Sequence, residues 1–418
     1  MRILHTADWH LGHRLYTRDR TPEHRAALQW LLRTVEEEAV DVVIIAGDVF
    51  DVTNPSNQAK ELYYEFLAGL VKTRCASAVI VGGNHDSASL LDAPRGLLRA
   101  LQLHVVGAAH TDASERVLPI RCAAGELLVA AVPYLRERDL RSAQFGEGST
   151  DRLQALREGI RRHFTEIAEA AREMRQDPGT PIVATGHLFA AGAADDEEKK
   201  SYIYQADENN IEAAHFPDCF DYVALGHVHR AQRIGDNDRI RYAGSLVPLT
   251  FVEGQASRSV CLVELGRAGE AVRTRKINVP AARTLLRLHA TFAEVKDRLR
   301  EAVRELPPPP ALQPWVEVRI KTDTPIPNLR EKLYAVIREA AGDTPDAAPV
   351  DILRISTERQ TARPGGQADD TPRQLDELQP VDVFEQLCER EAFPADHRDG
   401  LKNDFRELYN WISEQDEA

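Results

Sequence analysis

Residues 41–51 read DVVIIAGDVFD, an apolar run that is followed by a glycine and two aspartates. The length and unbroken hydrophobicity of this run predict a β-strand that is buried on both faces of a sheet. Similar strand-sized runs occupy residues 3–6, 78–81, 182–185 and 222–225, and residues 22–39, 57–72 and 90–101 carry apolar residues at helical spacing. Strands that alternate with helices in this way predict an α/β layer fold.

The segments further along the chain extend this first domain. Residues 116–132 hold two consecutive strand patterns, and residues 151–174 have the spacing of a long amphipathic helix. Three more strand patterns, at residues 240–244, 259–265 and 271–279, predict a run of antiparallel strands. We therefore place the first domain at residues 1–282.

Three shorter segments complete the chain. Residues 283–357 repeat a βαβαβ pattern, residues 358–378 have linker composition, and residues 379–418 hold two amphipathic helices, at 381–391 and 396–412. Two short helices bury too little surface to be stable alone. We expect them to dock either on their own protein or, more in keeping with a linker, on a partner.

Composition narrows the class of protein. The 418 residues carry a formal net charge of −14, and residues 358–418 contribute most of it. The five cysteines form no CxxC pair, which disfavours both a disulfide framework and a thiolate metal site. No apolar stretch approaches the roughly 20 residues of a membrane helix, and the N-terminus lacks the apolar core of a signal peptide. We expect a cytoplasmic protein, and the absence of a GxxxxGK[ST] motif predicts no P-loop.

Polar residues of metal-ligand type follow five of the predicted strands. The five motifs are Asp8-Trp9-His10, Gly47-Asp48-Val49-Phe50-Asp51, Gly83-Asn84-His85-Asp86, Gly186-His187 and Gly226-His227-Val228-His229. Because the carboxyl ends of strands in an α/β sheet form one ligand-binding edge, these loops are expected to converge on a single site. Each motif alone is weak evidence, whereas the ordered set of five is specific.

Seven of these side chains have the chemistry of a two-metal site. Asp48 is predicted to bridge two ions, with Asp8, His10 and His229 completing one ion and Asn84, His187 and His227 the other. Oxygen and nitrogen ligands without a thiolate suit Mn²⁺, Fe²⁺ or Zn²⁺. Two such ions neutralise the charge that develops while an activated water attacks phosphorus in line.

Two further residues of the third motif are predicted to be catalytic. His85 lies beside the expected ligand Asn84, where an imidazole can give a proton to a leaving oxygen or stabilise the pentacoordinate state. Asp86 is expected to orient the His85 ring.

The ordered set resembles the calcineurin-like metallophosphoesterases, whose pattern is D-x-H, G-D-x-x-D, G-N-H-D/E, G-H and G-H-x-H. The stretches HTADWHLGHRLY, GDVFDVTNPSNQA, GNHDSASLLDAP, VPYLRERDLR, YVALGHVHRAQ and YAGSLVPLTFVEG narrow the resemblance to the SbcD nuclease subunits of bacterial SbcCD complexes. The resemblance is nearly continuous over residues 1–280 and looser beyond. No expected ligand position departs from the pattern.

This resemblance implies a fold, an activity and partners. The fold is a two-sheet sandwich flanked by helices, with residues 283–357 as a capping domain and residues 379–418 as a helix pair that docks on the ATPase SbcC. The activity is that of a manganese-dependent 3′ to 5′ exonuclease on duplex DNA and an endonuclease on single strands or hairpins, in DNA repair, recombination and replication. Mg²⁺ is an alternative ion. The assembly is expected to hold two SbcC and two SbcD chains, with a homodimer through the nuclease domain.

The residues that contact DNA are less evident from the sequence. Arg136, Arg138 and Arg141 follow one strand, and Arg230 and Arg233 follow the last motif, so either group could reach phosphates or form ordinary solvated surface. Residues 195–200 (DDEEKK) are expected to form a solvated loop tip.

Two other functions share parts of this pattern. A phosphoprotein phosphatase or cyclic-nucleotide phosphodiesterase would use the same metal motifs, because the metal centre does not select the substrate. A non-catalytic scaffold with this fold would have no use for a complete ligand set. The cap and the helix pair favour the nuclease over the phosphatase or cyclic-nucleotide phosphodiesterase.

Overall fold

The computed structural model describes residues 1–109, 112–141, 149–190, 211–235, 237–306, 312–342 and 349–358, together with positions 384, 401 and 405. By its internal contacts the chain divides into two units, Met1–Gln360 and Thr361–Ala418. The predicted linker and C-terminal helix pair lie almost wholly outside the described residues. Within the described residues, no helix is both long enough and apolar enough to cross a membrane.

The first six-stranded sheet contains the strand that carries the DVVIIAGDVFD segment. In spatial order its strands are β14 (Arg273–Asn278), β13 (Ser259–Glu264), β1 (Arg2–Thr6), β4 (Val42–Ala46), β5 (Ser77–Val81) and β6 (Leu103–Val106). β1, β4, β5 and β6 are parallel, while β13 pairs antiparallel with both β1 and β14. All five residues of β4 are buried, as the continuous apolar run predicts.

A second six-stranded sheet also contains four parallel strands. Its order is β11 (Gln232–Ile234), β12 (Asn237–Tyr242), β10 (Tyr222–Gly226), β9 (Ile182–His187), β8 (Gly125–Ala130) and β7 (Val117–Cys122). β8, β9, β10 and β12 are parallel, and an antiparallel strand closes each edge. Parallel strands in both sheets direct their carboxyl ends to one edge of the molecule.

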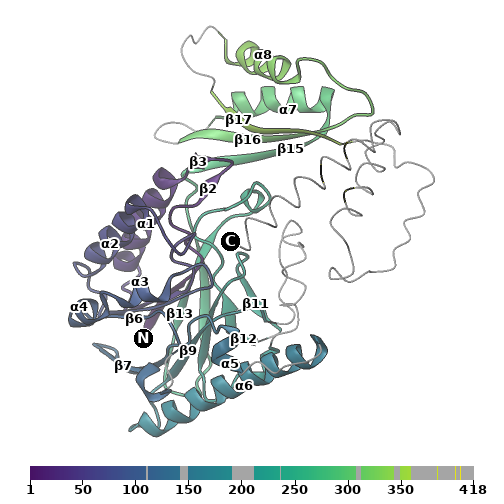
Figure 1. Cartoon of the computed structure of the whole chain (residues 1–418). Coiled ribbons are helices and arrows are strands. Elements are labelled where there is room, and N and C mark those ends of the chain that lie inside the picture. The colour runs from purple at the N-terminus through teal and green to yellow at the C-terminus, as the bar shows by residue number, and fades with distance from the viewer. Residues whose placement is uncertain are drawn as a thin grey trace. The chain divides into compact units, whose positions relative to one another are not determined.

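The two sheets pack face to face, which confirms the expected sandwich. Side chains from both inner faces, among them Ile44 and Val79 of the first sheet and Val183 and Ala224 of the second, form one buried cluster. Helices α1 (Thr21–Glu37) and α2 (Asn57–Leu70) cover the outer face of the first sheet, and α6 (Ser149–Met174) covers the second (Figure 1). Each helix buries one apolar face, in keeping with its spacing.

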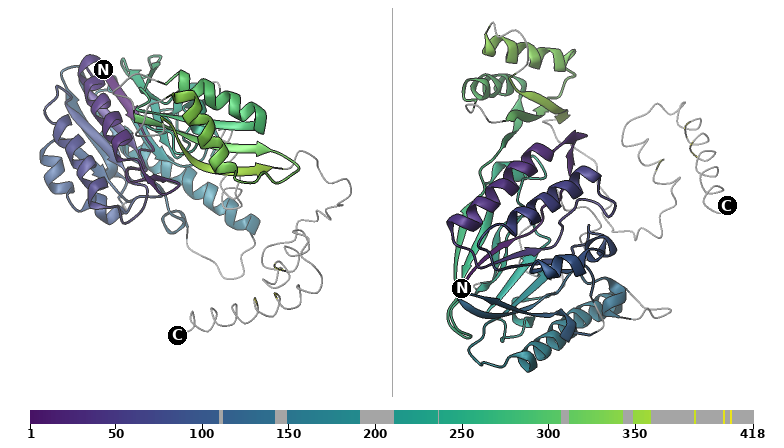
Figure 2. Two further views of the ribbon diagram at one scale, coloured as in Figure 1. Left: turned by 90° about the horizontal axis from the view of Figure 1, so that it is seen from above. Right: turned by 90° about the vertical axis from the view of Figure 1, so that its left-hand side faces the viewer.

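Residues 283–358 form the expected small βαβαβ unit. Its elements are β15 (Arg283–Thr291), α7 (Phe292–Arg304), β16 (Leu312–Lys321), α8 (Leu329–Ala341) and β17 (Asp351–Glu358). The three strands are parallel, and Figure 2 shows both helices on one face of their sheet. α7 begins at a capping box in which Thr291 and Glu294 satisfy each other's backbone N–H groups.

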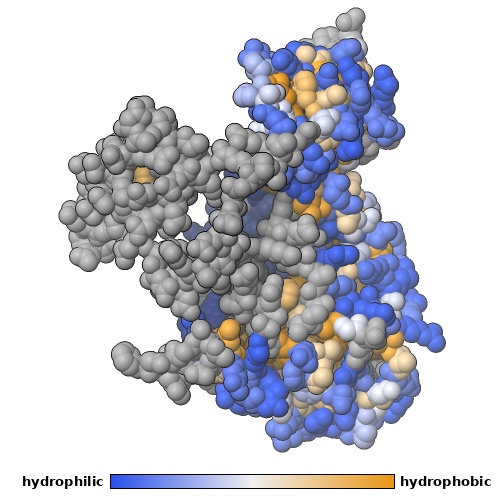
Figure 3. All heavy atoms as spheres, turned by 90° about the vertical axis from the view of Figure 1, so that its right-hand side faces the viewer, coloured by the Kyte–Doolittle hydropathy of each residue, from blue (hydrophilic) through white to orange (hydrophobic). Residues whose placement is uncertain are grey.

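On the face drawn in Figure 3, the described surface of the molecule is mainly hydrophilic.

Charged side chains join this unit to the rest of Met1–Gln360. Nε of Arg283 lies 2.6 Å from Oε1 of Glu23, and the Arg283 guanidinium lies 3.9 Å from the centre of the Trp315 ring. Glu23 also binds Arg20, and all three charged side chains are largely buried. We keep the division at residue 282 as a proposal.

The local predictions need three corrections. The helix expected at 90–101 is two short helices, α3 (Ala88–Asp92) and α4 (Arg95–Ala100), because Pro94 cannot donate to a continuing helix. The three strands expected to form one antiparallel run are split, since β12 lies in the second sheet and β13 and β14 in the first. Strands β6 and β11 and the short hairpin β2 (Arg14–Leu15) and β3 (Arg18–Asp19) were not expected.

Candidate metal centre

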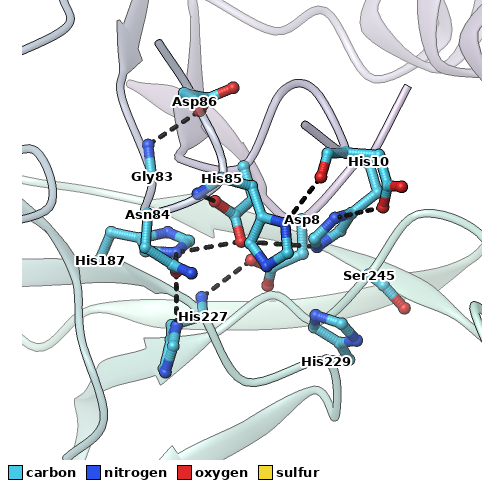
Figure 4. Close-up of polar contacts among 12 residues, drawn as sticks. Asp8, His10, Gly83, Asn84, His85, Asp86, His187, His227, His229 and Ser245 are labelled. Carbon is cyan, nitrogen blue, oxygen red and sulfur yellow. Dashed lines mark hydrogen bonds and ion pairs between the residues drawn. The ribbon is translucent and has the colours of Figure 1, made fainter. Parts of the chain in front are cut away.

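The structure brings all seven expected ligands together at the carboxyl edge of the sandwich. Asp8 and His10 follow β1, Asp48 follows β4, Asn84 follows β5, His187 ends β9, and His227 and His229 follow β10. Figure 4 shows His10 and His229 on one side of Asp8, and Asn84, His187 and His227 on the other. Sheet geometry makes this convergence possible, because each parallel strand delivers its loop to the same edge.

The backbone is bent sharply where it delivers these side chains. Positive φ angles occur at Asp8 (51°), His10 (47°), Asp48 (49°) and His227 (99°). Residues other than glycine rarely adopt this left-handed region. Hydrogen bonds hold the turns. The amide of Asp8 donates to the carbonyl of Gly47 and the amide of His10 to the carbonyl of Asp48, both at a distance of 3.0 Å. Strain of this kind gathers at functional sites.

Two glycines are required for the close approach of the loops. A Cβ on Gly47, which itself has a φ of 91°, would lie 2.2 Å from Nδ1 of His187. A Cβ on Gly83 would lie 2.1 Å from Oδ1 of Asp48. The glycines of the GD and GN motifs therefore make room for the ligands beside them.

Asp8, His10 and His229 form the first half of the cluster. Their ligand atoms all lie within 4.8 Å of one another, and the three residues are buried. Oδ2 of Asp8 and Nε2 of His10 are buried without a hydrogen-bond partner. Unsatisfied buried polar atoms are costly, so this half of the cluster fits a cation that would satisfy them.

Asn84, His187 and His227 form the second half. Oδ1 of Asn84 lies 3.0 Å from Nε2 of His187 and 3.0 Å from Nδ1 of His227. Oδ2 of Asp48 lies between the halves, 3.3 Å from Nε2 of His187 and 3.5 Å from Nε2 of His10. Asp48 thus occupies the position that a bridging carboxylate requires.

Hydrogen bonds to the opposite ring nitrogen fix the orientation of the histidines. Nδ1 of His187 donates to the carbonyl of Ala46 over 2.9 Å, which directs Nε2 toward Asp48. Nδ1 of His10 lies 3.2 Å from Oδ1 of Asp51, and Nδ1 of His229 lies 3.1 Å from Oε1 of Glu253. Metal-ligating histidines are held in this way, because the outer partner sets the tautomer and the ring angle.

The electrostatics of the cluster favour positive charge. Burial opposes protonation of His187, but the adjacent Asp48 carboxylate outweighs it and raises the pKa of His187 to about 9. Burial likewise opposes ionisation of Asp48, yet His187 and then His10 hold its pKa well below the usual range. Bound dications would replace the protons that these histidines otherwise carry.

His85 lies at the rim of the cluster, half-buried, with its ring 4.8 Å from the ring of His10. Nδ1 of His85 donates to the carbonyl of Asp51 over 2.7 Å, and its backbone amide donates to Oδ1 of Asp48 over 2.9 Å. Because the carbonyl only accepts, Nε2 is the ring nitrogen that remains to exchange a proton with substrate.

The expectation that Asp86 orients the His85 ring is wrong, because the Asp51 carbonyl does so. The buried Asp86 carboxylate accepts hydrogen bonds from the backbone amides of Val49, Phe50 and Gly83, at 2.8–3.1 Å. Burial and then repulsion from Asp48 raise the pKa of Asp86 to about 6. Asp86 therefore ties the loop after β4 to the loop after β5, and it positions ligands rather than reacting groups.

Sequence reasoning missed two carboxylates that hold the ligands. Asp51 belongs to the GDVFD motif but received no role, and it contacts His10 directly. Glu253 lies in η4 (Glu253–Gln255), within the stretch YAGSLVPLTFVEG, where nothing in its spacing marks it. Its side chain contacts His229 and Arg258, and it accepts a hydrogen bond from the amide of Leu249.

The two candidate groups of DNA-binding arginines differ in surroundings. Arg138 lies 3.8 Å from Asp139, and Arg141 pairs with Glu137, both within α5 (Glu137–Leu140) or beside it. Arg136 forms the N-cap of that helix. Arg230 and Arg233 line an open depression. The loop tip predicted at residues 195–200 lies outside the described residues.

Comparison with known proteins agrees with the fold. A family model described as calcineurin-like phosphoesterase matches residues 1–231, and one described as type 5 capsule protein repressor C-terminal domain matches residues 281–392. The fold and the buried His/Asp cluster therefore define a metal-dependent phosphoesterase of the calcineurin-like class.

Curated relatives narrow the class. The chain is 32% identical over 418 residues to the SbcD subunit of the SbcCD nuclease of Escherichia coli (strain K12), with 100% of both chains covered. It is 33% identical to the protein of that name from Rhodobacter capsulatus, covering 92% of this chain and 93% of the other. The Bacillus subtilis protein is 31% identical, with 77% and 79% covered. The chain belongs to the family of SbcD nuclease subunits.

A solved dimetal phosphatase from Danio rerio also overlaps this chain. The identity is 13%, the TM-score is 0.35, and the overlap covers 67% of this chain and 99% of the other.

Proposed function

We propose that this chain is the nuclease of an SbcCD-type complex and hydrolyses DNA phosphodiesters at two metal ions. The cluster of seven ligand side chains at one edge of the sandwich carries the proposal. It places ligand atoms on both sides of Asp48, and two of its buried atoms, Oδ2 of Asp8 and Nε2 of His10, have no hydrogen-bond partner. The activity we propose is 3′ to 5′ digestion of duplex ends together with cleavage of single strands and hairpins, in DNA repair, recombination and replication.

Manganese is the ion that we propose for the cell. Asp8, His10 and His229 would hold one ion, Asn84, His187 and His227 the other, and Asp48 both. Carboxylate and amide oxygens suit Mn²⁺, and the same set of oxygen and imidazole donors would also accept Fe²⁺, Zn²⁺ or Mg²⁺. Bound dications supply Lewis-acid stabilisation of the phosphate and lower the pKa of water.

The chain's own residues provide the remaining steps. Asp51 fixes the His85 ring through its carbonyl, so that Nε2 of the doubly protonated ring can donate its proton to the oxygen that leaves phosphorus and Nδ1 keeps its own. Asp86 holds the loops after β4 and β5 together and so keeps Asp48 and Asn84 in register. Asp51 and Glu253 orient His10 and His229.

Assembly with SbcC is the second part of the proposal. We assign docking to the helix pair within residues 379–418, in a complex of two SbcC and two SbcD chains in the cytoplasm. Self-association through the nuclease domain is supported by exposed apolar side chains on and just after α2 and α4, namely Tyr64, Val71, Leu97 and Leu101. Deletion of 379–418 should abolish capture of SbcC while Mn²⁺ binding is kept. A pull-down in which the shortened chain still recovers SbcC would refute this docking site.

A comparison of substrates tests the catalytic proposal. The full chain, loaded with Mn²⁺ and mixed with SbcC and ATP, should cleave end-labelled DNA and leave phosphoserine peptides and cyclic nucleotides intact. Hydrolysis of those small substrates without any cleavage of DNA would instead favour a phosphatase or cyclic-nucleotide phosphodiesterase.

A further inference from the structure

A basic depression lies on the side of the sandwich where the edges of the two sheets meet. Its volume is about 470 Å³, and it is lined by Arg230, Ala231, Gln232, Arg233, Asp238, Arg241 and Lys276. β11 and β12 form its floor from the second sheet, and β14 of the first sheet contributes Lys276. Nζ of Lys276 donates to the carbonyl of Ala231 over 2.9 Å, which joins the two edges.

Positive charge exceeds negative charge in this depression. Four of the seven lining residues are cationic, and Asp238 is their one acidic neighbour among them. Asp238 lies 2.8 Å from Arg241 and 3.8 Å from Arg233. Within the part of the chain that the structure describes, neither Arg230 nor Lys276 forms an ion pair with a carboxylate, and both are exposed. The local excess contrasts with a chain whose net charge is −14.

The cations also repel one another. Partial burial lowers the pKa of Lys276, and the nearby guanidinium groups of Arg241 and Arg230 lower it further. A group of cations that outnumbers its carboxylates is stabilised by an anion from outside the chain.

The segment that lines the depression begins next to the metal centre in the sequence. Arg230 follows the expected ligand His229 directly, and β11 leads away from it. Arg258 donates to the carbonyl of His229 over 2.9 Å, so the start of this segment is fixed to the site. A polymeric substrate whose scissile phosphate lies at the cluster would therefore have neighbouring phosphates within reach of the depression.

We propose that Arg230, Arg233 and Lys276 bind the phosphate backbone of a nucleic-acid strand next to its cleavage site. The inference rests on the proposed nuclease function and names the surface that holds the substrate. Among the lining residues that the structure describes, none is an aromatic on which a base could stack, so the contact is with phosphates and is independent of sequence. In the alternative group, Arg138 and Arg141 pair with the carboxylates of Asp139 and Glu137.

The salt dependence of DNA binding tests this surface. The probes are a 5′-fluorescein single strand and a duplex of the same sequence, titrated with the full chain in EDTA over a range of KCl concentrations. The test variant is Arg230→Gln/Lys276→Gln. The control is Arg121→Gln/Arg161→Gln, which removes the same charge from side chains that are 83% and 53% exposed elsewhere. Melting temperature and Mn²⁺ affinity of each variant check the fold, and Arg230→Gln alone serves if the double variant does not fold.

The test variant should bind both probes about tenfold more weakly at low salt. Its plot of log K against log salt should be shallower by about 1.8 for the duplex and about 1.4 for the single strand, as expected for two lost phosphate contacts. The control should match the wild type. Equal slopes in test variant and wild type, while the wild type still cleaves DNA, would overturn this surface and leave the proposed function standing.

Two further outcomes separate the alternatives. A test variant that binds DNA normally but no longer captures SbcC would assign the depression to the partner protein and overturn the inference. A wild type that neither binds nor cleaves DNA would overturn the proposed function, and this inference would fail with it.

Discussion

Oε1 of Glu253 lies 3.1 Å from Nδ1 of His229, and this contact turns Nε2 of His229 toward Asp8 and His10. The Glu253 side chain is 1% exposed and is itself held, since Leu249 donates its amide to Oε2 over 2.9 Å. Arg258 lies 3.6 Å from the same oxygen and also binds the His229 carbonyl. A ligand 24 residues away in sequence is thus oriented by a carboxylate that does not itself belong to the ligand set.

Replacement of this carboxylate should weaken metal binding. Glu253→Gln keeps the size of the side chain but removes the charge that polarises His229, and loss of such an outer partner lowers metal affinity about 10–100-fold. Mn²⁺ titration by calorimetry measures the effect. Glu264→Gln, at a side chain that is 45% exposed on β13, is the matched control. Unchanged Mn²⁺ affinity in Glu253→Gln would show that Glu253 serves only the fold.

His85→Gln should separate binding from hydrolysis. The substitution leaves the expected ligands in place and removes the proton donor, so DNA cleavage should fall about 10²–10⁴-fold while Mn²⁺ and DNA affinity stay at wild-type values. Single-turnover cleavage and anisotropy, measured on the same preparation, provide both quantities. A nuclease rate equal to that of the wild type would rule out the role given to His85.

Gly83→Ala should displace Asp48, because the added Cβ would lie 2.1 Å from the Asp48 carboxylate and 2.3 Å from its amide. Overpacking of this kind typically costs about 1–3 kcal/mol, and we expect about tenfold or greater loss of Mn²⁺ affinity with it. Gly96→Ala is the control, since a Cβ there meets nothing within 4 Å. If both alanine variants bound Mn²⁺ like the wild type, the close approach of the loops would not matter for the site.

A buried histidine outside the metal centre predicts a loss of stability in acid. Burial, and then the neighbouring Arg116, lower the pKa of His163 to about 3, whereas an unfolded chain takes up this proton near pH 6.5. Stability from this residue is therefore complete above about pH 6.5 and declines as the pH falls toward 3.

His163→Gln isolates this effect, since glutamine can still accept from Arg116 but gains no proton. Between pH 7 and pH 5 the wild type should lose about 2 kcal/mol more unfolding free energy than the variant. Urea unfolding at the two pH values measures the difference. Parallel losses in wild type and variant would mean that His163 binds its proton equally well in the folded and the unfolded chain.

The strand-end motifs were predictable because parallel strands leave little freedom in where their loops go. Once β1, β4, β5, β9 and β10 were recognised as buried strands, Asp8, Asp48, Asn84, His187 and His227 had to share one edge. The βαβαβ order of residues 283–357 was predictable from the spacing of apolar residues, which differs between strands and helices.

The remaining features depend on contacts that spacing does not encode. Asp86 is next to His85 in sequence, but its side chain enters the protein and binds three backbone amides. Glu253 contacts His229 across a loop that has no periodic pattern. β12 and β13 have similar strand patterns, and only their partners place them in different sheets.

The central claim is that this buried cluster cleaves DNA. The most direct measurement follows release of label from a duplex labelled at its 3′ or its 5′ end, with Mn²⁺, SbcC and ATP, for the wild type and Asp48→Asn. The account predicts that the wild type releases the 3′ label first and that Asp48→Asn, which removes the predicted bridging charge, releases almost none. Cleavage by Asp48→Asn at the wild-type rate, or an intact duplex under every condition with the wild type, would contradict it.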